Sequence, residues 1–259
     1  MIETNVTGHA GEIAVHTWPN LEARWLAVLV HGFGEHLGRY EHVAAALADA
    51  GALVVGGDLA GHGGSDGPRA LITDVDALAG DVRTVVRTVG TELPTVLIGH
   101  SVGGLVAARY AQLHGAELAA LVLSAPVLGT WHGLDVASGE EVPVDPEALS
   151  RDPEVGKAYS ADPLVWHDKI GRPTLEALER GLDAVSFGPP LGDLPTLWLH
   201  GDADRIVPVA DTRAGTDRIR GLGFTERIYP GARHEVFNET NRDEVLADVV
   251  AFVGQVLDR

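Results

Sequence analysis

Short apolar segments alternate along this chain with segments of helical periodicity. Alternating apolar and polar residues over 12–18 predict a half-exposed edge strand, and the unbroken apolar run 25–30 predicts a buried strand. Similar short runs predict further strands at 52–55, 95–98, 121–123, 196–199 and 225–229. Strands that alternate with helices are typical of β-α-β units, so we expect an α/β fold with a mostly parallel central sheet flanked by helices.

Two segments show the clearest helical pattern. Between residues 75 and 89, apolar residues recur at steps of three and four, which gives a helix one apolar face toward the sheet. The same pattern between residues 245 and 256 predicts a closing helix. Thr240, with Asp243 three residues later, resembles a capping box and predicts where that helix begins.

The region from residue 127 to residue 190 breaks this alternation. It is rich in proline, glycine and acidic residues, contains no clear strand, and is much longer than an ordinary connection. We therefore expect residues 1–126 and 191–259 to form one core and residues 127–190 to form an inserted cap. Its apolar side chains are candidates to line a channel for an acyl chain: Val127, Leu128, Trp131, Leu164, Val165, Trp166 and Ile170.

Composition narrows the possible partners and compartments. A chain of 259 residues can build one sizeable core, and its formal net charge of -18 argues against nucleic-acid partners. There is no cysteine, which excludes disulfides and a thiolate nucleophile. The first residues lack the pattern of a secretory signal, and no apolar run is long enough to span a bilayer. We expect a cytoplasmic protein without integral membrane association, and its oligomeric state stays open.

A candidate nucleophile lies in the segment 99–104, which reads Gly-His-Ser-Val-Gly-Gly. It follows a predicted strand and precedes a helix-like segment, which is the context of the G-x-S-x-G elbow that exposes a serine hydroxyl above a sheet. Glycines two residues before and after Ser101 relieve the crowding in such a tight turn. An alternative is that Ser101 only caps the following helix.

A serine nucleophile needs an imidazole base and usually a carboxylate that orients it. His234 lies in the loop after the last predicted strand, where this fold places its base, and that position selects it among twelve histidines. The acid should follow the strand 196–199, where Asp202 and Asp204 are both candidates. Asp204 is preferred because Gly201-Asp202 is a dipeptide typical of turns. The backbone amides of Val102 and Phe33 are the candidates for an oxyanion hole.

Several motifs together resemble the monoacylglycerol lipases and their lysophospholipase-like relatives, and the resemblance covers essentially the whole chain. They are the segments 31–40, 58–65, 99–104 and 201–205, with 149–153 and 159–165 in the cap. The resemblance implies an α/β-hydrolase fold with a cap between the sixth and seventh core strands, and hydrolysis of a monoacylglycerol or similar small acyl ester without cofactor or metal. It also supports Ser101, Asp204 and His234 as the catalytic triad.

The same resemblance implies that Glu35, Arg39 and Tyr159 lie near the glycerol head group, and His100, beside the nucleophile, is a further substrate-binding candidate. Glu35 and Arg39 could equally form a surface ion pair. Two departures from the family pattern are Val102, where many members have methionine, and Phe237, where some have a histidine that contacts glycerol.

Two other functions stay open. An aminopeptidase or amidase on the same scaffold would need cap carboxylates that face the substrate amine, and Glu140, Glu141 and Asp145 are available. A non-catalytic ligand receptor could keep the fold, although the intact set of catalytic side chains argues against it. The loop around Asp58 and His62 is interpreted as structural, because no further ligands with suitable spacing accompany them.

Overall fold

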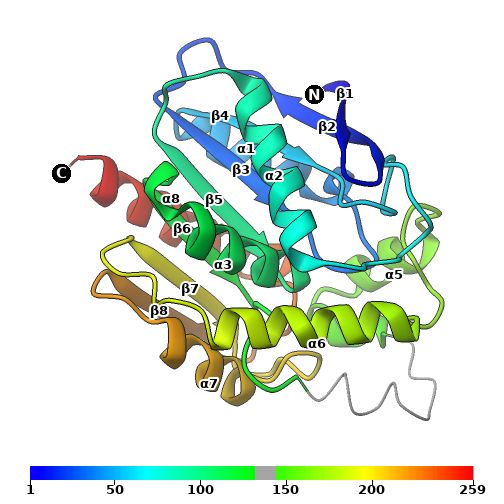
Figure 1. Cartoon of the computed structure of the whole chain (residues 1–259). Helices are drawn as coiled ribbons and strands as arrows, with labels where there is room; N and C mark the ends of the chain where they lie inside the picture. Colours follow the sequence, from blue (N-terminus) through cyan, green and yellow to red (C-terminus); the bar gives the residue numbers. More distant parts are fainter. Residues whose placement is uncertain (132–143, 259) are drawn as a thin grey trace.

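The computed structural model describes residues 1–131 and 144–258, which build one eight-stranded sheet covered by helices on both faces (Figure 1). The strand order is β1-β2-β4-β3-β5-β6-β7-β8. The strands are β1 (Ile2–Gly8), β2 (Gly11–Trp18), β3 (Trp25–Val30), β4 (Ala52–Gly57), β5 (Thr95–His100), β6 (Ala120–Ser124), β7 (Thr196–Gly201) and β8 (Phe224–Tyr229). The predicted α/β-hydrolase fold is confirmed.

Strand directions explain the apolar patterns in the sequence. β2 runs antiparallel to β1 and β4, and all pairs from β4 to β8 are parallel. Every residue of β3, β5 and β7 is buried, as expected for parallel strands covered on both faces. β1 was not predicted, because it lies at the sheet edge and is mostly exposed, so its residues carry little hydrophobic signal.

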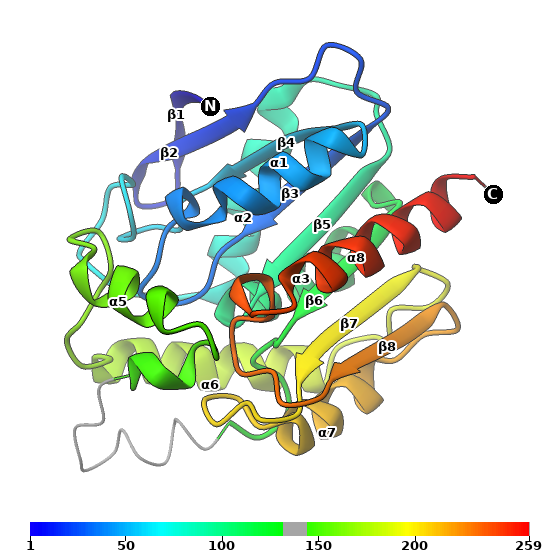
Figure 2. The same ribbon diagram turned by 180° about the vertical axis from the view of Figure 1, so that it is seen from behind.

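Helices cover the two faces of the sheet unequally. α1 and α8 pack on one face, and α2, α3, α6 and α7 lie on the other (Figures 1 and 2). The helices are α1 (Glu41–Asp49), α2 (Val75–Val89), α3 (Val102–His114), α5 (Pro153–Ala161), α6 (Arg172–Ser186), α7 (Val209–Ile219) and α8 (Arg242–Leu257). Short 3-10 helices are η1 (Leu37–Tyr40), η2 (Gly115–Glu117), η3 (Pro146–Ala148) and η4 (Val236–Asn238).

The predicted start of the closing helix is wrong in detail. α8 begins at Arg242, and Asn241 stands at its N-cap without a side-chain capping hydrogen bond. The hydroxyl of Thr240 instead donates to a carboxylate oxygen of Glu239, at 3.4 Å. Glu239 is buried and also accepts from Arg151, so it draws Thr240 away from the helix end.

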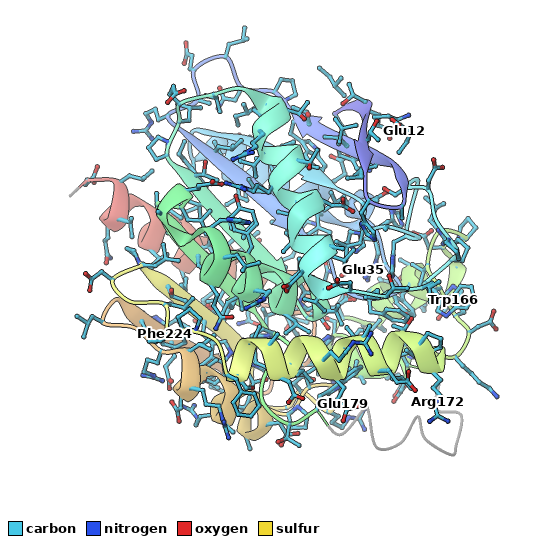
Figure 3. All side chains as sticks on the ribbon, viewed as in Figure 1. Glu12, Glu35, Trp166, Arg172, Glu179 and Phe224 are labelled. Atoms are coloured by element: carbon cyan, nitrogen blue, oxygen red, sulfur yellow. The ribbon has the colours of Figure 1, made fainter. Side chains whose placement is uncertain are left out.

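Within its described residues, the segment between β6 and β7 includes the helices α5 and α6. Buried residues on α6 include Leu178 and Leu182, which join the apolar core shared with α2 and α3. The charged Arg172 and Glu179 project from the solvent side of α6 (Figure 3). This spacing of buried and exposed positions is that of an amphipathic helix, and α6 is thereby fixed to the core.

The carboxyl ends of the parallel strands meet at one edge of the sheet. His31 follows β3 there, Ser101 follows β5, Asp204 lies three residues beyond β7, and His234 lies five residues beyond β8. In open α/β sheets this edge is where ligands bind. None of the helices in the described part of the chain is long and apolar enough to cross a membrane.

Candidate active site

Ser101 occupies a strained turn between β5 and α3. Its backbone has φ 54° and ψ -121°, a conformation that costs energy for a residue with a side chain. The turn is held because the amide of Ser101 donates to the carbonyl of Ser124 at 3.0 Å. A Cβ atom on Gly103 would clash with the carbonyl oxygens of Val30 and His31, so this position requires glycine. The side chain of Ser101 makes no capping hydrogen bond, so the helix-cap alternative is wrong.

The structure brings Ser101, His234 and Asp204 together in one hydrogen-bonded chain. The Nε2 atom of His234 lies 3.0 Å from Oγ of Ser101, and its Nδ1 atom lies 2.8 Å from Oδ2 of Asp204. A carboxylate only accepts, so Nδ1 carries the proton and Nε2 is free to accept the serine hydroxyl. This arrangement has the geometry of a base beside a serine nucleophile.

Charges around His234 favour its protonated form. Burial alone would lower the pKa of His234, but the carboxylates of Asp204, Glu235 and Glu35 raise it above the usual 6.5. Burial would raise the pKa of Asp204, yet His234 and His200 hold it well below the usual range. Asp204 therefore stays ionised beside an imidazole whose proton affinity is increased.

Environment separates the two aspartates that competed in the sequence. Asp204 is buried, and its Oδ1 atom accepts hydrogen bonds from the amides of Ile206 and Val207 at 2.8 and 2.9 Å. Asp202 is exposed, and its carboxylate accepts from the amide of Gly231 at 2.6 Å. Asp202 therefore stabilises the loop between β8 and His234 and does not contact the imidazole.

The two candidate oxyanion donors lie beside the nucleophile. Val102 is the first residue of α3, so its amide has no acceptor within the helix. Phe33 lies in the loop after β3, and both residues line the same cavity as Ser101. The ring of Phe33 packs edge-on against His62, with ring centroids 5.4 Å apart.

Glu35 and Arg39 form an ion pair, but the surface position considered for it is wrong, because Glu35 is only 4% exposed. Arg39 Nη1 donates to Glu35 at 2.6 Å, and its two terminal nitrogens donate to Glu235 at 2.8 Å each. The other oxygen of Glu35 accepts from the amide of Gly32 and the hydroxyl of Tyr40. We call Glu35, Arg39 and Glu235 the arginine cluster.

The arginine cluster carries two carboxylates and one guanidinium. Burial would raise the pKa of Glu35, but Arg39 and the nearby histidines lower it to about 2. Burial would lower the pKa of Arg39, and its two carboxylate partners raise it far above the usual value. Glu235 was not predicted as a site residue, although it directly follows His234. Its contact with Arg39 joins positions 196 residues apart.

His100 and Tyr159 also border the nucleophile. The Nδ1 atom of His100 lies 3.1 Å from the carbonyl oxygen of Ser124, and its ring lies 4.8 Å from that of His234. Burial, together with the neighbouring His234, lowers the pKa of His100 to about 4. Arg39 stacks on the ring of Tyr159 at 5.2 Å. Both His100 and Tyr159 line the cavity of Ser101.

The cavity over Ser101 is small, with a volume of about 70 Å³, and it opens to solvent. Of the apolar cap residues singled out in the sequence, Trp131 and Ile170 line it. Val127 and Leu128 belong to the main core, and Leu164 is exposed. Among the described residues, the other apolar side chains that line the cavity are those of Val144, Leu149 and Ile206, with Phe33 and Val102 from the core.

Other candidate ligands are engaged elsewhere. Glu140 and Glu141 lie outside the described residues, and Asp145 is exposed and pairs with Arg205 at 3.4 Å. Asp58 accepts hydrogen bonds from the amides of Leu37 and Gly64. Among residues 1–131 and 144–258, no three His, Asp or Glu side chains gather in a way that could hold a metal ion.

Phe237, which stands where some family members have a histidine, is buried in the core between the sheet, α1 and α8. Its backbone carbonyl oxygen lies 2.8 Å from Nε2 of His42. The side chain does not line the cavity of Ser101. A head-group contact from this position is therefore missing.

Comparison with known proteins identifies the family of this chain. Residues 22–241 match the family model described as serine aminopeptidase, S33. A monoacylglycerol lipase of Mycolicibacterium smegmatis is 36% identical over 93% of this chain and 92% of its own, and the human monoglyceride lipase is 30% identical over 83% and 76%. The crystal structure of Paleococcus ferrophilus monoacylglycerol lipase matches with a TM-score of 0.83 and 29% identity, covering 95% of this chain and 99% of that one. The chain is a serine hydrolase, and it belongs to the serine aminopeptidase S33 family of α/β-hydrolases together with its monoacylglycerol lipase relatives.

Proposed function

We propose that this protein hydrolyses monoacylglycerols, or closely similar small acyl esters, through an acyl-enzyme on Ser101. The observation that carries the proposal is the hydrogen-bonded chain from Ser101 Oγ through His234 to Asp204, which opens into a cavity with apolar walls and a buried polar cluster. Apolar walls suit an acyl chain, and the buried polar side chains suit a hydroxylated head group. The monoacylglycerol lipase relatives support the same substrate class.

The first half of the reaction forms the acyl-enzyme. Ser101 Oγ attacks the ester carbonyl carbon while its proton moves to Nε2 of His234. The amides of Phe33 and Val102 donate hydrogen bonds to the oxygen anion that forms. The carbon–oxygen bond to glycerol then breaks, and the leaving oxygen takes the proton from His234.

The second half releases the fatty acid. A water molecule gives a proton to Nε2 of His234 and attacks the acyl carbon, and the bond to Ser101 Oγ breaks as Oγ recovers the proton. Asp204 remains ionised throughout and stabilises the imidazolium that forms in each half-reaction. The cycle uses water, these side chains and the two backbone amides.

The arginine cluster supports a neutral head group. Two carboxylates and one guanidinium leave a net charge of -1, and Arg39 is already engaged by both glutamates. An anionic phosphate near this cluster would meet net repulsion in a desolvated setting. Glycerol hydroxyls, which donate and accept hydrogen bonds, suit Glu35, Tyr159 and His100 better.

Among the described residues, no carboxylate near the cavity is left without a cationic partner, which gives an aminopeptidase little support. A substrate ammonium group needs a carboxylate that is free to pair with it. Glu35 and Glu235 are both held by Arg39, and Asp145 pairs with Arg205 outside the cavity of Ser101.

We also propose that residues 127–190 act as a cap over this cavity, and that the protein works in the cytoplasm.

Substitution of Ser101 tests the proposal. Ser101→Ala should lower hydrolysis of a medium-chain monoacylglycerol at least about 1,000-fold, since the nucleophile is lost. Ser160→Ala is the matched control, because the Ser160 hydroxyl lies on α5 and donates only to the carbonyl of Gly156. Wild-type protein should also react with a fluorophosphonate at Ser101.

A substrate panel identifies the reaction. It compares monoacylglycerols of several chain lengths with lysophospholipids of matched acyl chains and with an aminoacyl anilide. Preferential hydrolysis of the monoacylglycerols supports the proposal. Faster turnover of the anilide, or full activity of Ser101→Ala, would show that the proposal is wrong.

A further inference from the structure

A second histidine contacts the carboxylate of Asp204. His200 lies near the end of β7 (Thr196–Gly201) and is completely buried. Its Nε2 atom lies 3.1 Å from Oδ2 of Asp204, the same oxygen that accepts from His234 at 2.8 Å. Two imidazoles from different strand ends therefore share one carboxylate oxygen. His200 was not among the candidate residues, although it lies four positions before Asp204.

The tautomer of His200 is fixed by its other neighbour. The indole Nε1–H of Trp198 donates to Nδ1 of His200 at 3.1 Å. An indole nitrogen only donates, so Nδ1 must accept and the proton of His200 lies on Nε2. That Nε2–H is shared between Oδ2 of Asp204 and the carbonyl oxygen of Val207, 2.8 Å away. A proton on Nδ1 would put two N–H groups against each other.

With His200, Asp204 accepts four hydrogen bonds. The amides of Ile206 and Val207 bind Oδ1, and the imidazoles of His234 and His200 bind Oδ2. The amides fix the plane of the carboxylate from one side, and His200 fixes Oδ2 from the other. A rotation of the carboxylate away from His234 would leave a fully buried Nε2–H of His200 with only the carbonyl of Val207.

We propose that His200 is a positioning residue for the hydrolysis reaction. It holds Oδ2 of Asp204 in line with Nδ1 of His234, and Trp198 supports it by fixing its tautomer. His200 does not line the cavity of Ser101, so it acts only through Asp204. The inference rests on the proposed function, because it assigns a role within the same catalytic chain.

The positions of the charged groups predict how the pH profile responds. The groups that face Asp204 are His234 and His200, and those that act on His234 are Asp204, Glu235, Glu35 and the neighbouring His100. Without the N–H donor of His200, the negative charge of Asp204 is stabilised by one hydrogen bond fewer. The pKa of His234 should then rise further, because its imidazolium faces a less neutralised carboxylate.

The test uses two variants of His200 and one of Trp198. His200→Leu removes the donor and should lower kcat about tenfold to a hundredfold with little change in KM, because only the orientation of the base is disturbed. Its acid limb of kcat/KM should move to higher pH. His200→Gln keeps a donor amide and an acceptor oxygen, so it should recover most of the lost rate. The kcat of Trp198→Phe should lie between those of His200→Leu and His200→Gln, because His200 can then change tautomer.

His9→Leu serves as the control for the loss of a histidine–carboxylate pair. His9 contacts Asp81 at 2.6 Å, in the loop after β1, on the side of the sheet far from β7. This variant should lower stability without changing kcat or the pH profile. Thermal unfolding of each variant shows whether it is folded, and Trp198→Phe carries the test where His200→Leu does not fold.

The rate of fluorophosphonate labelling at Ser101 separates this inference from the substrate assignment. Labelling needs the hydrogen-bonded chain but no particular ester. Wild-type protein that labels rapidly but leaves monoacylglycerols intact would overturn the proposed substrate alone. Folded His200→Leu that labels at the wild-type rate, or an acid limb that stays in place or moves to lower pH, would overturn the role of His200.

Discussion

Arg39 holds two buried carboxylates together, and its removal should destabilise the protein strongly. In Arg39→Met, the methionine keeps much of the side-chain volume but leaves Glu35 and Glu235 facing each other without a cation. Both glutamate side chains are 5% exposed in the intact pair, so water cannot replace the guanidinium well. The buried charge of the cluster changes from -1 to -2.

The size of the effect follows from two independent arguments. Removal of one partner from a buried ion pair costs about 3–5 kcal/mol. The pKa of Glu35, lowered from 4.5 to about 2, corresponds to about 3 kcal/mol of differential interaction at neutral pH. We therefore expect Arg39→Met to lose about 3–5 kcal/mol of unfolding free energy at pH 7.

The pH dependence gives the prediction a sign. In the intact protein, Glu35 contributes stability above its usual pKa of 4.5, and this contribution is lost as the pH falls toward about 2. In Arg39→Met, the unpaired buried carboxylates bind protons more readily than in the unfolded chain. The deficit relative to wild type should therefore shrink between pH 7 and pH 5.

Urea unfolding followed by circular dichroism at both pH values measures this deficit. Glu235→Gln is the matched control, because it keeps the pair of Glu35 with Arg39 and brings the net charge of the cluster to zero. Its stability should remain within about 1.5 kcal/mol of wild type. A deficit for Arg39→Met below about 1 kcal/mol at pH 7, or one equal at both pH values, would refute the reasoning.

Three further predictions concern the catalytic chain. The acid limb of kcat/KM should lie above pH 6.5, because the reaction needs neutral His234 and nearby carboxylates raise its pKa; a pH–rate profile checks this. Asp204→Asn should reduce kcat about 10,000-fold, whereas Asp202→Asn should leave it within about twofold, and steady-state kinetics distinguish them. Gly103→Ala should destabilise the protein by about 3 kcal/mol or more, because its methyl group meets the carbonyl of Val30; chemical unfolding measures the loss.

The sequence predicted the sheet well because most of its strands are buried on both faces. Continuous apolar runs such as β3 and β5 leave a signal that periodicity detects. β1 left no such signal because five of its seven residues are exposed. The start of α8 was also predicted wrongly. Thr240 has the right residue type for a cap, but its amide and hydroxyl both donate to the carboxylate of the buried Glu239.

Some site residues can be predicted from the residues next to them in the sequence, and others only from contacts with distant parts of the chain. Ser101 lies in a motif whose glycines are needed by the turn itself, so the sequence around Ser101 predicts the geometry of that turn. Glu235 and His200 have no such motif, because their roles depend on partners that the fold supplies. Glu235 meets Arg39 across 196 positions, and no spacing rule within a single helix or strand predicts that contact.

Asp202 and Asp204 show why residue type alone cannot separate such roles. They are the same residue two positions apart, and turn chemistry gave only a preference between them. In the structure one is exposed and accepts from the amide of Gly231, and the other is buried and accepts from two amides and two imidazoles. The second imidazole is supplied by His200, on β7 just before this loop. A carboxylate held at both oxygens is restrained from turning away from the imidazole of His234, and that restraint suits the role proposed for Asp204.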